Sequence, residues 1–383
     1  MRVVVAIDSF KGSLSTFQSG EAVKTGIRRI YEDAEVDICP LADGGEGTVD
    51  AIVAATDGKI ETVTVTGPLG EPVSAAYGIM GDQLTAVMEM SAAAGITLVP
   101  EEKRDPLATT TYGVGEMILH AIRKHGCRRF IMGIGGSATN DGGVGMLAAL
   151  GFEFLDACGN PIPLGGVGVG KIVSICTKAV APELAECEFT VACDVKNPLC
   201  GDSGCSAVYG PQKGATPETV KLMDGWLAEY AKKTAELFGE DLSNYEGAGA
   251  AGGMGFAFIS YLRGALRSGI ETVIEVTKLE AHIKGADMVV TGEGRLDGQS
   301  VMGKAPIGVA RAAKKYGKTV IAFSGAVTAD AVECNKHGID AFFPILRKPC
   351  ALAEAMDIDN AYNNLADTAE QVFGLIRQIK DNG

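Results

Sequence analysis

The sequence has few histidines, no excess of positive charge and no long hydrophobic run, and each of these absences excludes a class of function. Its 383 residues include only four histidines, with no H-E-x-x-H or G-x-S-x-G motif. A zinc hydrolase and a serine acyl transferase are therefore poorly supported. Lysine and arginine total 34 against 48 aspartates and glutamates, a net charge of −14. Nucleic acids and anionic membranes are bound by basic surfaces, so neither partner is expected.

No apolar span of 18 residues occurs, which argues against a membrane-spanning helix. The apolar run at residues 3–7 is too short for a signal peptide and ends at Asp8. Ten cysteines are present without a C-x-x-C pair, and several lie in apolar runs where cysteine acts as a small hydrophobic residue. The expected location is the cytoplasm. The oligomeric state cannot be deduced from the sequence.

The order of the expected strands and helices indicates two domains, as the chain length also suggests. Strand and helix alternate near both ends of the chain, which is typical of a parallel α/β sheet. The middle instead contains alternating segments typical of antiparallel hairpins, at 61–66, 73–79 and 85–90. We therefore predict an α/β fold in which residues 1–60 and 266–383 form a Rossmann-like three-layer domain. Residues 61–265 form an inserted mixed α/β domain.

The segment 288–306 carries the strongest chemical pattern. It begins as a buried strand, is expected to become a glycine-rich loop after residue 290, and leads into a helix. Ligands bind where a strand of an open α/β sheet ends, and glycines let backbone N–H groups approach an anion. The glycines are Gly292, Gly294, Gly298 and Gly303, and the charged residues are Glu293, Arg295, Asp297 and Lys304. A P-loop is not predicted, because alanine follows the lysine where a serine or threonine would bind Mg²⁺.

Four further loops combine aspartate with glycine or lysine at strand ends. They contain Asp8 with Lys11, Asp43 with Glu46, Asn140 with Asp141, and Asp194 with Lys196 and Asn197. Lys213 adds a cation before a helix. Phosphoryl transfer needs carboxylates for Mg²⁺ and for the hydroxyl proton, and cations for the moving group. The residues therefore favour phosphoryl transfer to a small acceptor.

The loop at 133–138 leaves a different function open. Its sequence GIGGSA fits the G-x-G-x-x-A dinucleotide fingerprint and follows a predicted strand. A NAD(P)-dependent oxidoreductase of a small hydroxy acid is the alternative hypothesis. Asn140 and Asp141 argue against it, because they interrupt the start of the helix and the acid would repel a pyrophosphate. A two-domain ligand-binding protein that uses the same cleft is a third interpretation.

Several of these segments together resemble the bacterial type I glycerate kinase family. The segments are 8–15 (DSFKGSLS), 40–48 (PLADGGEGT), 133–143 (GIGGSATNDGG) and 291–297 (TGEGRLD), and 193–199 (CDVKNPL) and 210–216 (GPQKGAT) fit as well. The resemblance extends to about residue 326. It implies phosphorylation of D-glycerate by ATP with Mg²⁺, with 2-phosphoglycerate the favoured product and 3-phosphoglycerate the alternative. It also implies a Rossmann-like domain with an inserted α/β domain.

We predict that the active site lies in the cleft between the domains, with glycerate and ATP as its small-molecule substrates. The predicted catalytic residues are Asp194 as the base, Asp43 as the second choice for it, Arg295 and Lys11. Arg295 binds the glycerate carboxylate or steadies the γ-phosphate. The predicted nucleotide-binding residues are Lys213, Lys304, Gly292, Gly294, Gly135 and Gly136. The predicted substrate-binding residues are Arg295, Asn140, Asp141 and Glu46, and the predicted metal ligands are Asp8, Glu293 and Asp297.

Overall fold

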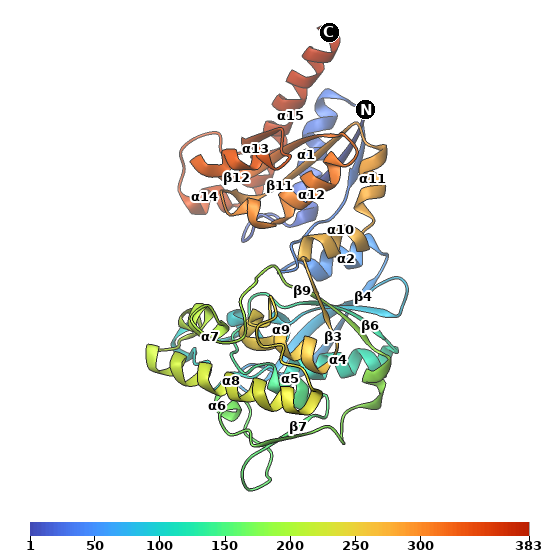
Figure 1. Cartoon of the computed structure of the whole chain (residues 1–383). Helices are drawn as coiled ribbons and strands as arrows, with labels where there is room; N and C mark the ends of the chain where they lie inside the picture. Colours follow the sequence, from blue (N-terminus) through green and yellow to red (C-terminus); the bar gives the residue numbers. More distant parts are fainter. Residues whose placement is uncertain (383) are drawn as a thin grey trace. The chain divides into compact units, whose positions relative to one another are not determined.

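The computed structural model describes residues 1–382, which form two compact units (Figure 1). Unit 1 comprises residues 1–43 and the chain from residue 270 onward, and unit 2 comprises residues 44–269. The structure therefore divides the chain at different positions from 60/61 and 265/266. Helix α2 (Thr48–Ala55) accounts for the first difference, because it packs against the first three strands of unit 2.

Unit 1 contains a five-stranded sheet in which all neighbouring strands are parallel. Its order is β13 (Ala341–Pro344), β12 (Thr319–Val327), β11 (Met288–Leu296), β1 (Arg2–Ile7) and β2 (Glu35–Ile38). The other elements are α1 (Thr16–Ile30), α10 (Gly269–Val276), α11 (Leu279–Gly285), η5 (Ser300–Met302), α12 (Ala305–Lys314), η6 (Ala329–Val332), α13 (Glu333–Lys336), α14 (Leu352–Met356) and α15 (Ile358–Asn382).

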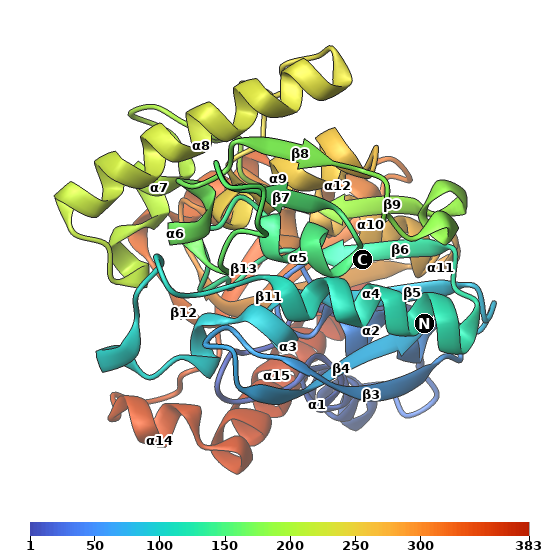
Figure 2. The ribbon, with the colours of Figure 1, turned by 90° about the horizontal axis from the view of Figure 1, so that it is seen from below.

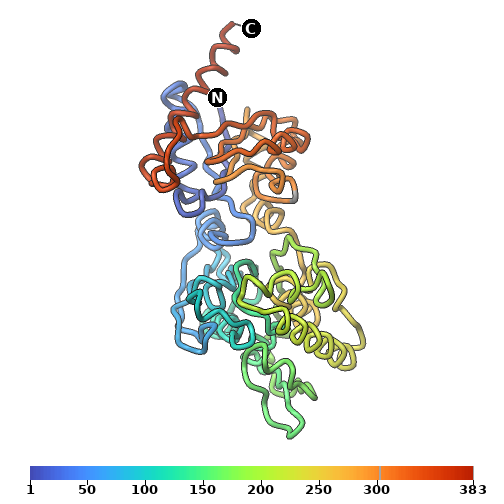
Figure 3. Tube along the Cα trace, turned by 90° about the vertical axis from the view of Figure 1, so that its left-hand side faces the viewer, coloured from blue at the N-terminus to red at the C-terminus, as the bar shows by residue number. Residues whose placement is uncertain are grey.

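Helices cover both faces of this sheet, so unit 1 has three layers. Val3 and Val5 of β1 belong to one apolar cluster with α1 and α15, and these two helices pack side by side (Figure 3). Successive side chains of a strand point to opposite faces, and α11 and α12 pack against β1 from the other side. Helix α1 starts at a capping box, in which Ser15 and Gln18 each accept the other's backbone N–H. The α/β three-layer prediction is confirmed.

Unit 2 contains a six-stranded mixed sheet. Its order is β10 (Ala265–Arg267), β9 (Glu188–Ala192), β6 (Arg129–Gly133), β5 (Thr85–Glu89), β4 (Pro72–Ile79) and β3 (Lys59–Thr66). The pairs β3–β4 and β4–β5 are antiparallel and the others are parallel. A small antiparallel sheet joins β7 (Glu153–Leu155) to β8 (Ser174–Cys176). This is the mixed α/β composition that the sequence predicted.

Helices lie on both faces of the larger sheet as well. Gly78 of β4 faces α2, since a Cβ there would lie 2.3 Å from Val53 Cγ2, whereas Tyr77 contacts His120 of α4 (Tyr112–His125). The main apolar cluster lies on the α4 side and includes α5 (Val144–Ala149), α8 (Pro217–Phe238) and α9 (Ala250–Tyr261) (Figure 2). The shorter helices are α3 (Ser91–Ala94), η1 (Ile96–Leu98), η2 (Glu101–Lys103), α6 (Gly166–Val169), η3 (Pro182–Glu186), α7 (Cys205–Tyr209) and η4 (Pro211–Lys213). Within residues 1–382, no helix is both long enough and apolar enough to cross a membrane.

Candidate functional site

Two buried carboxyl groups mark the carboxyl edge of the unit 1 sheet. Strands β1 and β11 are parallel with Ile7 opposite Gly292, so Asp8 and Glu293 leave neighbouring strands at the same end. Asp8 is 5% exposed and Glu293 is 8% exposed. Burial raises the pKa of Asp8 to about 7, and the negative charges of Asp43 and Glu293 add to this effect. An acid that is only half ionised near neutral pH is a common feature of functional sites.

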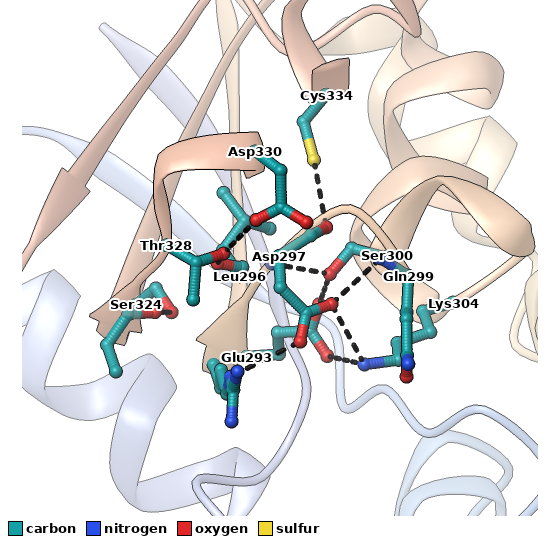
Figure 4. A network of polar contacts seen from close by, with 12 residues as sticks. Glu293, Leu296, Asp297, Gln299, Ser300, Lys304, Ser324, Thr328, Asp330 and Cys334 are labelled. Carbon is teal, nitrogen blue, oxygen red and sulfur yellow. Dashed lines mark hydrogen bonds and ion pairs between the residues drawn. The ribbon is translucent and has the colours of Figure 1, made fainter. Parts of the chain in front are cut away.

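Glu293 is held by groups from the start of the following helix (Figure 4). The Ser300 hydroxyl donates a hydrogen bond of 2.6 Å to Glu293 Oε1, and the Lys304 ammonium lies 3.8 Å from Glu293 Oε2. Burial raises the pKa of Glu293, and the Ser300 hydroxyl and the Lys304 charge oppose the shift. The Lys304 ammonium also lies 3.8 Å from Asp297 Oδ1. Lys304 thus neutralises two carboxylates at the amino-terminal end of α12.

The segment that the sequence predicted as a loop after residue 290 is partly a strand. Strand β11 continues to Leu296, because its ladder with β12 persists to the pair Leu296–Val327 after β1 has ended. Glu293 and Arg295 therefore project from a strand, which fixes their backbones more firmly than a loop would. The Arg295 side chain is 67% exposed, and its Nε lies 3.2 Å from Asp297 Oδ2.

The two glycines of this strand differ in how closely other residues pack against them. A Cβ on Gly292 would lie 2.0 Å from the carbonyl oxygen of Phe323 on β12. The Gly292 carbonyl accepts a 3.0 Å hydrogen bond from the Asp8 N–H. Gly292 therefore holds the start of the loop that contains Asp8. A Cβ on Gly294 would lie 3.4 Å from Phe10 Cα. The pairing of β11 with β12 therefore leaves no room for a side chain at Gly292, whereas a Cβ at Gly294 would make only an ordinary contact. The predicted contact of both glycines with nucleotide stays a prediction.

The turn that follows β12 contributes residues that the sequence did not single out. Thr328 donates its backbone N–H to Leu296 O at 3.1 Å, and its hydroxyl binds Asp330. A Cβ on Gly298 would lie 2.5 Å from Asp330 Oδ2. Thr328 and Asp330 thus hold the 296–298 segment from the side of β12 (Figure 4). Asp330 follows a strand, as the predicted acids do, and this signal could have revealed it.

Unit 2 presents a second set of predicted residues around the loop after β6. Lys213 is 2% exposed, and its ammonium donates to Ser137 Oγ at 2.8 Å and to Thr139 O at 2.6 Å. Burial lowers the pKa of Lys213 to about 8. Lys213 is therefore built into the loop that carries the exposed Gly135 and Gly136. It supplies positive charge there from inside the unit.

Asn140 and Asp141 lie inside unit 2, at 1% and 0% exposure. The Asp141 carboxylate accepts hydrogen bonds from the N–H and the hydroxyl of Thr111, both at 2.8 Å. It also accepts the N–H groups of Gly143 and Gly145 at 3.1 and 3.3 Å. Asn140 donates to the Ser206 hydroxyl at 2.9 Å. All of these contacts join the loop to its own unit, which indicates a structural contribution from both residues.

The remaining predicted residues lie on loops at the ends of strands. Asp194 is exposed after β9, and its Oδ1 accepts the Gly269 N–H at 3.2 Å. Glu46 is also exposed, and Lys11 is exposed in the loop after β1. Sequence reasoning missed Glu89, at the end of β5, which accepts the Val49 N–H at 3.1 Å. This carboxylate, whose pKa is raised by burial, holds the start of α2.

The predicted residues are divided between the two units. Asp8, Asp43, Glu293, Asp297 and Lys304 belong to unit 1, and the charges of the others shift the pKa of Asp8 or of Glu293. Those of unit 2 are Glu46, Gly135, Gly136, Asn140, Asp141, Asp194 and Lys213. Among the described residues, no three His, Cys, Asp or Glu side chains are arranged to hold a metal ion. Mg²⁺ commonly uses only one or two carboxylates, together with water and phosphate oxygens, so the acids of unit 1 still fit this ion.

Comparison with known proteins identifies close relatives along almost the whole chain. The model of the glycerate kinase family matches residues 3–377. A protein named glycerate kinase from Haemophilus influenzae is 48% identical over 97% of this chain and 98% of its own length. A glycerate 2-kinase from Escherichia coli is 48% identical over 97% of both chains. A crystal structure of a glycerate kinase 2 from Salmonella typhimurium LT2 has a TM-score of 0.91 and 47% identity, and covers 100% of this chain and 99% of that chain.

Proposed function

Because the chain belongs to the glycerate kinase family, we propose that it transfers the γ-phosphoryl group of ATP to a hydroxyl group of D-glycerate with Mg²⁺. The observation that carries this proposal is the cluster of Asp8, Glu293, Asp297 and Lys304 at one edge of a parallel sheet. Carboxylates beside a lysine at the start of a helix suit a metal–triphosphate group. The oxidoreductase alternative has no such support. In the loop after β6, Asp141 is buried and the short helix α5 begins only at Val144.

The metal ion would be held in unit 1. Asp8 and Glu293, on neighbouring strands, are the proposed ligands, with Asp297 as an acceptor for a bound water. When bound, Mg²⁺ would neutralise charge on the triphosphate. Lys304 and Lys11 would contact phosphate oxygens, and Arg295 would bind either the γ-phosphate or the glycerate carboxylate.

Asp194 is proposed to accept the proton of the attacking hydroxyl group. It is exposed at the end of β9, and its hydrogen bond from the Gly269 N–H holds the carboxylate in place, as the positioning of an attacking hydroxyl group requires. Asp43 is the second candidate, and we propose that both units supply catalytic residues. For Asn140 and Asp141 we propose a structural role in place of substrate contact.

The product is proposed to be 2-phosphoglycerate, as the name of the Escherichia coli relative suggests. The protein is expected in the cytoplasm, where thiols stay reduced; all ten of its cysteines, each within the described residues, are free. Phosphorus NMR of the product distinguishes the 2-phosphate from the 3-phosphate by the coupling of phosphorus to one or two protons.

The activity is tested by incubating the protein with D-glycerate and either Mg·ATP or NAD⁺. Release of ADP that depends on glycerate supports the kinase, whereas formation of reduced nicotinamide would establish the oxidoreductase instead. Asp194→Asn should lower kcat by about 10²-fold or more with little change in the KM values, since a positioned base contributes about that much. Arg295→Ala should raise the KM of the substrate that it binds. Near-normal kinetics in both variants would refute these two assignments.

A further inference from the structure

Arg104 of unit 2 is a half-buried cation without an acidic partner. It follows η2, and its Nε is buried with no hydrogen-bond partner among the described residues. Three other arginines of the unit, at positions 123, 128 and 129, pair with carboxylates, Arg263 is exposed, and Arg267 is exposed and has a partner within the chain. A guanidinium stays charged, and a charge withdrawn from water is normally paired. The Arg104 side chain therefore indicates an anionic partner from outside the chain.

The backbone of Arg104 packs against the segment that carries Lys213. Gly214 packs directly on it, because a Cβ at that glycine would lie 2.1 Å from the Arg104 carbonyl oxygen. Gly214 has a φ of +98°, a conformation that glycine adopts readily, and it follows the buried Lys213. Downstream of Arg104, Thr109 donates its hydroxyl to Ala138 O at 2.9 Å. Arg104 and Lys213 thus come from touching segments that both border residues 137–139.

Lys213 and Arg104 differ in how many of their side-chain N–H groups form hydrogen bonds within the protein. Two of the three hydrogens of the Lys213 ammonium are used on Ser137 and Thr139, so this residue holds the loop and adds positive potential. The guanidinium of Arg104 makes no such contact within the described chain. No hydrogen bond or ion pair occupies its Nη groups among the described residues, so they remain as donors for a ligand. A planar pair of N–H donors matches the two oxygens of a carboxylate.

We propose that Arg104 binds the carboxylate of D-glycerate through its two Nη groups, an inference that rests on the proposed function. Arg295 is the competing residue, but it is 67% exposed and already pairs with Asp297. Its guanidinium is better suited to phosphate oxygens near the Asp8 and Glu293 cluster. Arg104 therefore explains why the protein would select a carboxylic acid over a neutral polyol. Lys213 holds residues 137–139 in position through its two hydrogen bonds.

The test compares Arg104→Gln and Arg104→Lys with Arg123→Gln, which removes an exposed arginine of the same unit. Arg104→Gln should raise the KM for D-glycerate about 10- to 100-fold, the usual effect of losing a charge-assisted hydrogen-bond pair. The KM for ATP should stay within about twofold, because the lost contact is not to nucleotide. Lysine keeps the charge but not the fork, so it should recover only part of the affinity. Arg123→Gln should behave as the wild type.

Ligand binding separates this inference from the proposed function. Calorimetry without ATP should show that Arg104→Gln weakens binding of D-glycerate but leaves that of D-glyceramide, which lacks the anion, unchanged. Wild-type protein that neither binds nor phosphorylates D-glycerate would refute the proposed function. Active wild-type protein together with an Arg104→Gln variant that is folded by circular dichroism and binds D-glycerate normally would overturn the role of Arg104. A raised KM for ATP alone would overturn the carboxylate assignment.

Discussion

Asp8 couples the protonation of the unit 1 cluster to folding. Its pKa in the folded protein is about 7, above the ordinary value of 3.8, because of burial and the nearby charge of Asp43. The folded state therefore keeps a proton that the unfolded state has lost. The stability that this proton provides is complete below about pH 4 and disappears as the pH rises through 7. Ionisation of Asp8 opposes folding at neutral pH until a cation reaches it.

We predict that Asp8→Asn stabilises the metal-free protein more at pH 8 than at pH 5. The asparagine cannot ionise, so the gain between these pH values should be roughly 3 kcal/mol at most. Urea unfolding of both proteins in chelator at the two pH values measures it. Asp82→Asn is the control, because the Asp82 pKa is lowered by its hydrogen bonds and the group is ionised throughout that range. Equal effects of Asp8→Asn at both pH values would contradict the prediction.

Sequence reasoning found acids at strand ends but could not tell which of them have their carboxylate oxygens occupied by hydrogen bonds within the protein. Asp8 and Asp141 both follow apolar strands and precede glycine within a few residues. In the structure, the Asp141 carboxylate accepts hydrogen bonds from the N–H and hydroxyl of Thr111 and from two further backbone N–H groups. The Asp8 carboxylate accepts a hydrogen bond of 2.7 Å from the Ser9 N–H. The difference depends on neighbours distant in the sequence, and the same limit hid Arg104, whose unpaired state requires knowledge of its surroundings.

At the scale of elements, the alternating pattern predicted most strands within one or two residues. The segments 61–66, 73–79 and 85–90 correspond to β3, β4 and β5. The carboxyl end of β11 could not be predicted, because Gly292 and Gly294 suggest a loop. Hydrogen-bonded pairing with β12, which the local sequence does not reveal, keeps these residues in the strand. Helix α2 lies within residues 1–60, which the sequence grouped with the first domain, whereas it packs against β3, β4 and β5 of unit 2. Its neighbours depend on tertiary contacts that the local pattern does not contain.

The turn after β12 should control the geometry of the 296–298 segment. Gly298→Ala would place a methyl group against Asp330, whose carboxylate is held by the Thr328 hydroxyl and whose pKa is lowered by that contact. We predict that Gly298→Ala lowers kcat/KM roughly 10-fold, and that the same change costs much less in an Asp330→Ala background, where the methyl group has room. A double-mutant cycle in kcat/KM measures this coupling. Additive effects of the two changes would show that the contact does not matter for activity.

At the scale of the molecule, each unit has its own apolar cluster, and unit 2 is a single continuous stretch of chain. The cluster of unit 2 draws on its strands and on α4, α5, α8 and α9, and that of unit 1 on α1, α15 and its own sheet. The two ends of unit 2 meet, because a Cβ on Gly44 would lie 2.9 Å from Gly269 Cα. A unit with its own core and adjacent ends is expected to fold alone.

We therefore predict that residues 44–269 fold as an isolated fragment, and that unit 1 folds when residues 43 and 270 are joined through two glycines. Each fragment should show native-like circular dichroism and one cooperative transition in urea. Residues 1–43 alone are the control and should stay unfolded, because β1 then lacks its pairing with β11 and the pair β1–β2 has no further strand. Neither folded fragment should phosphorylate D-glycerate, since the proposed metal ligands and the proposed base belong to different units. Full activity from a single fragment would rule out the proposal that both units supply catalytic residues, even if every fragment folded as expected.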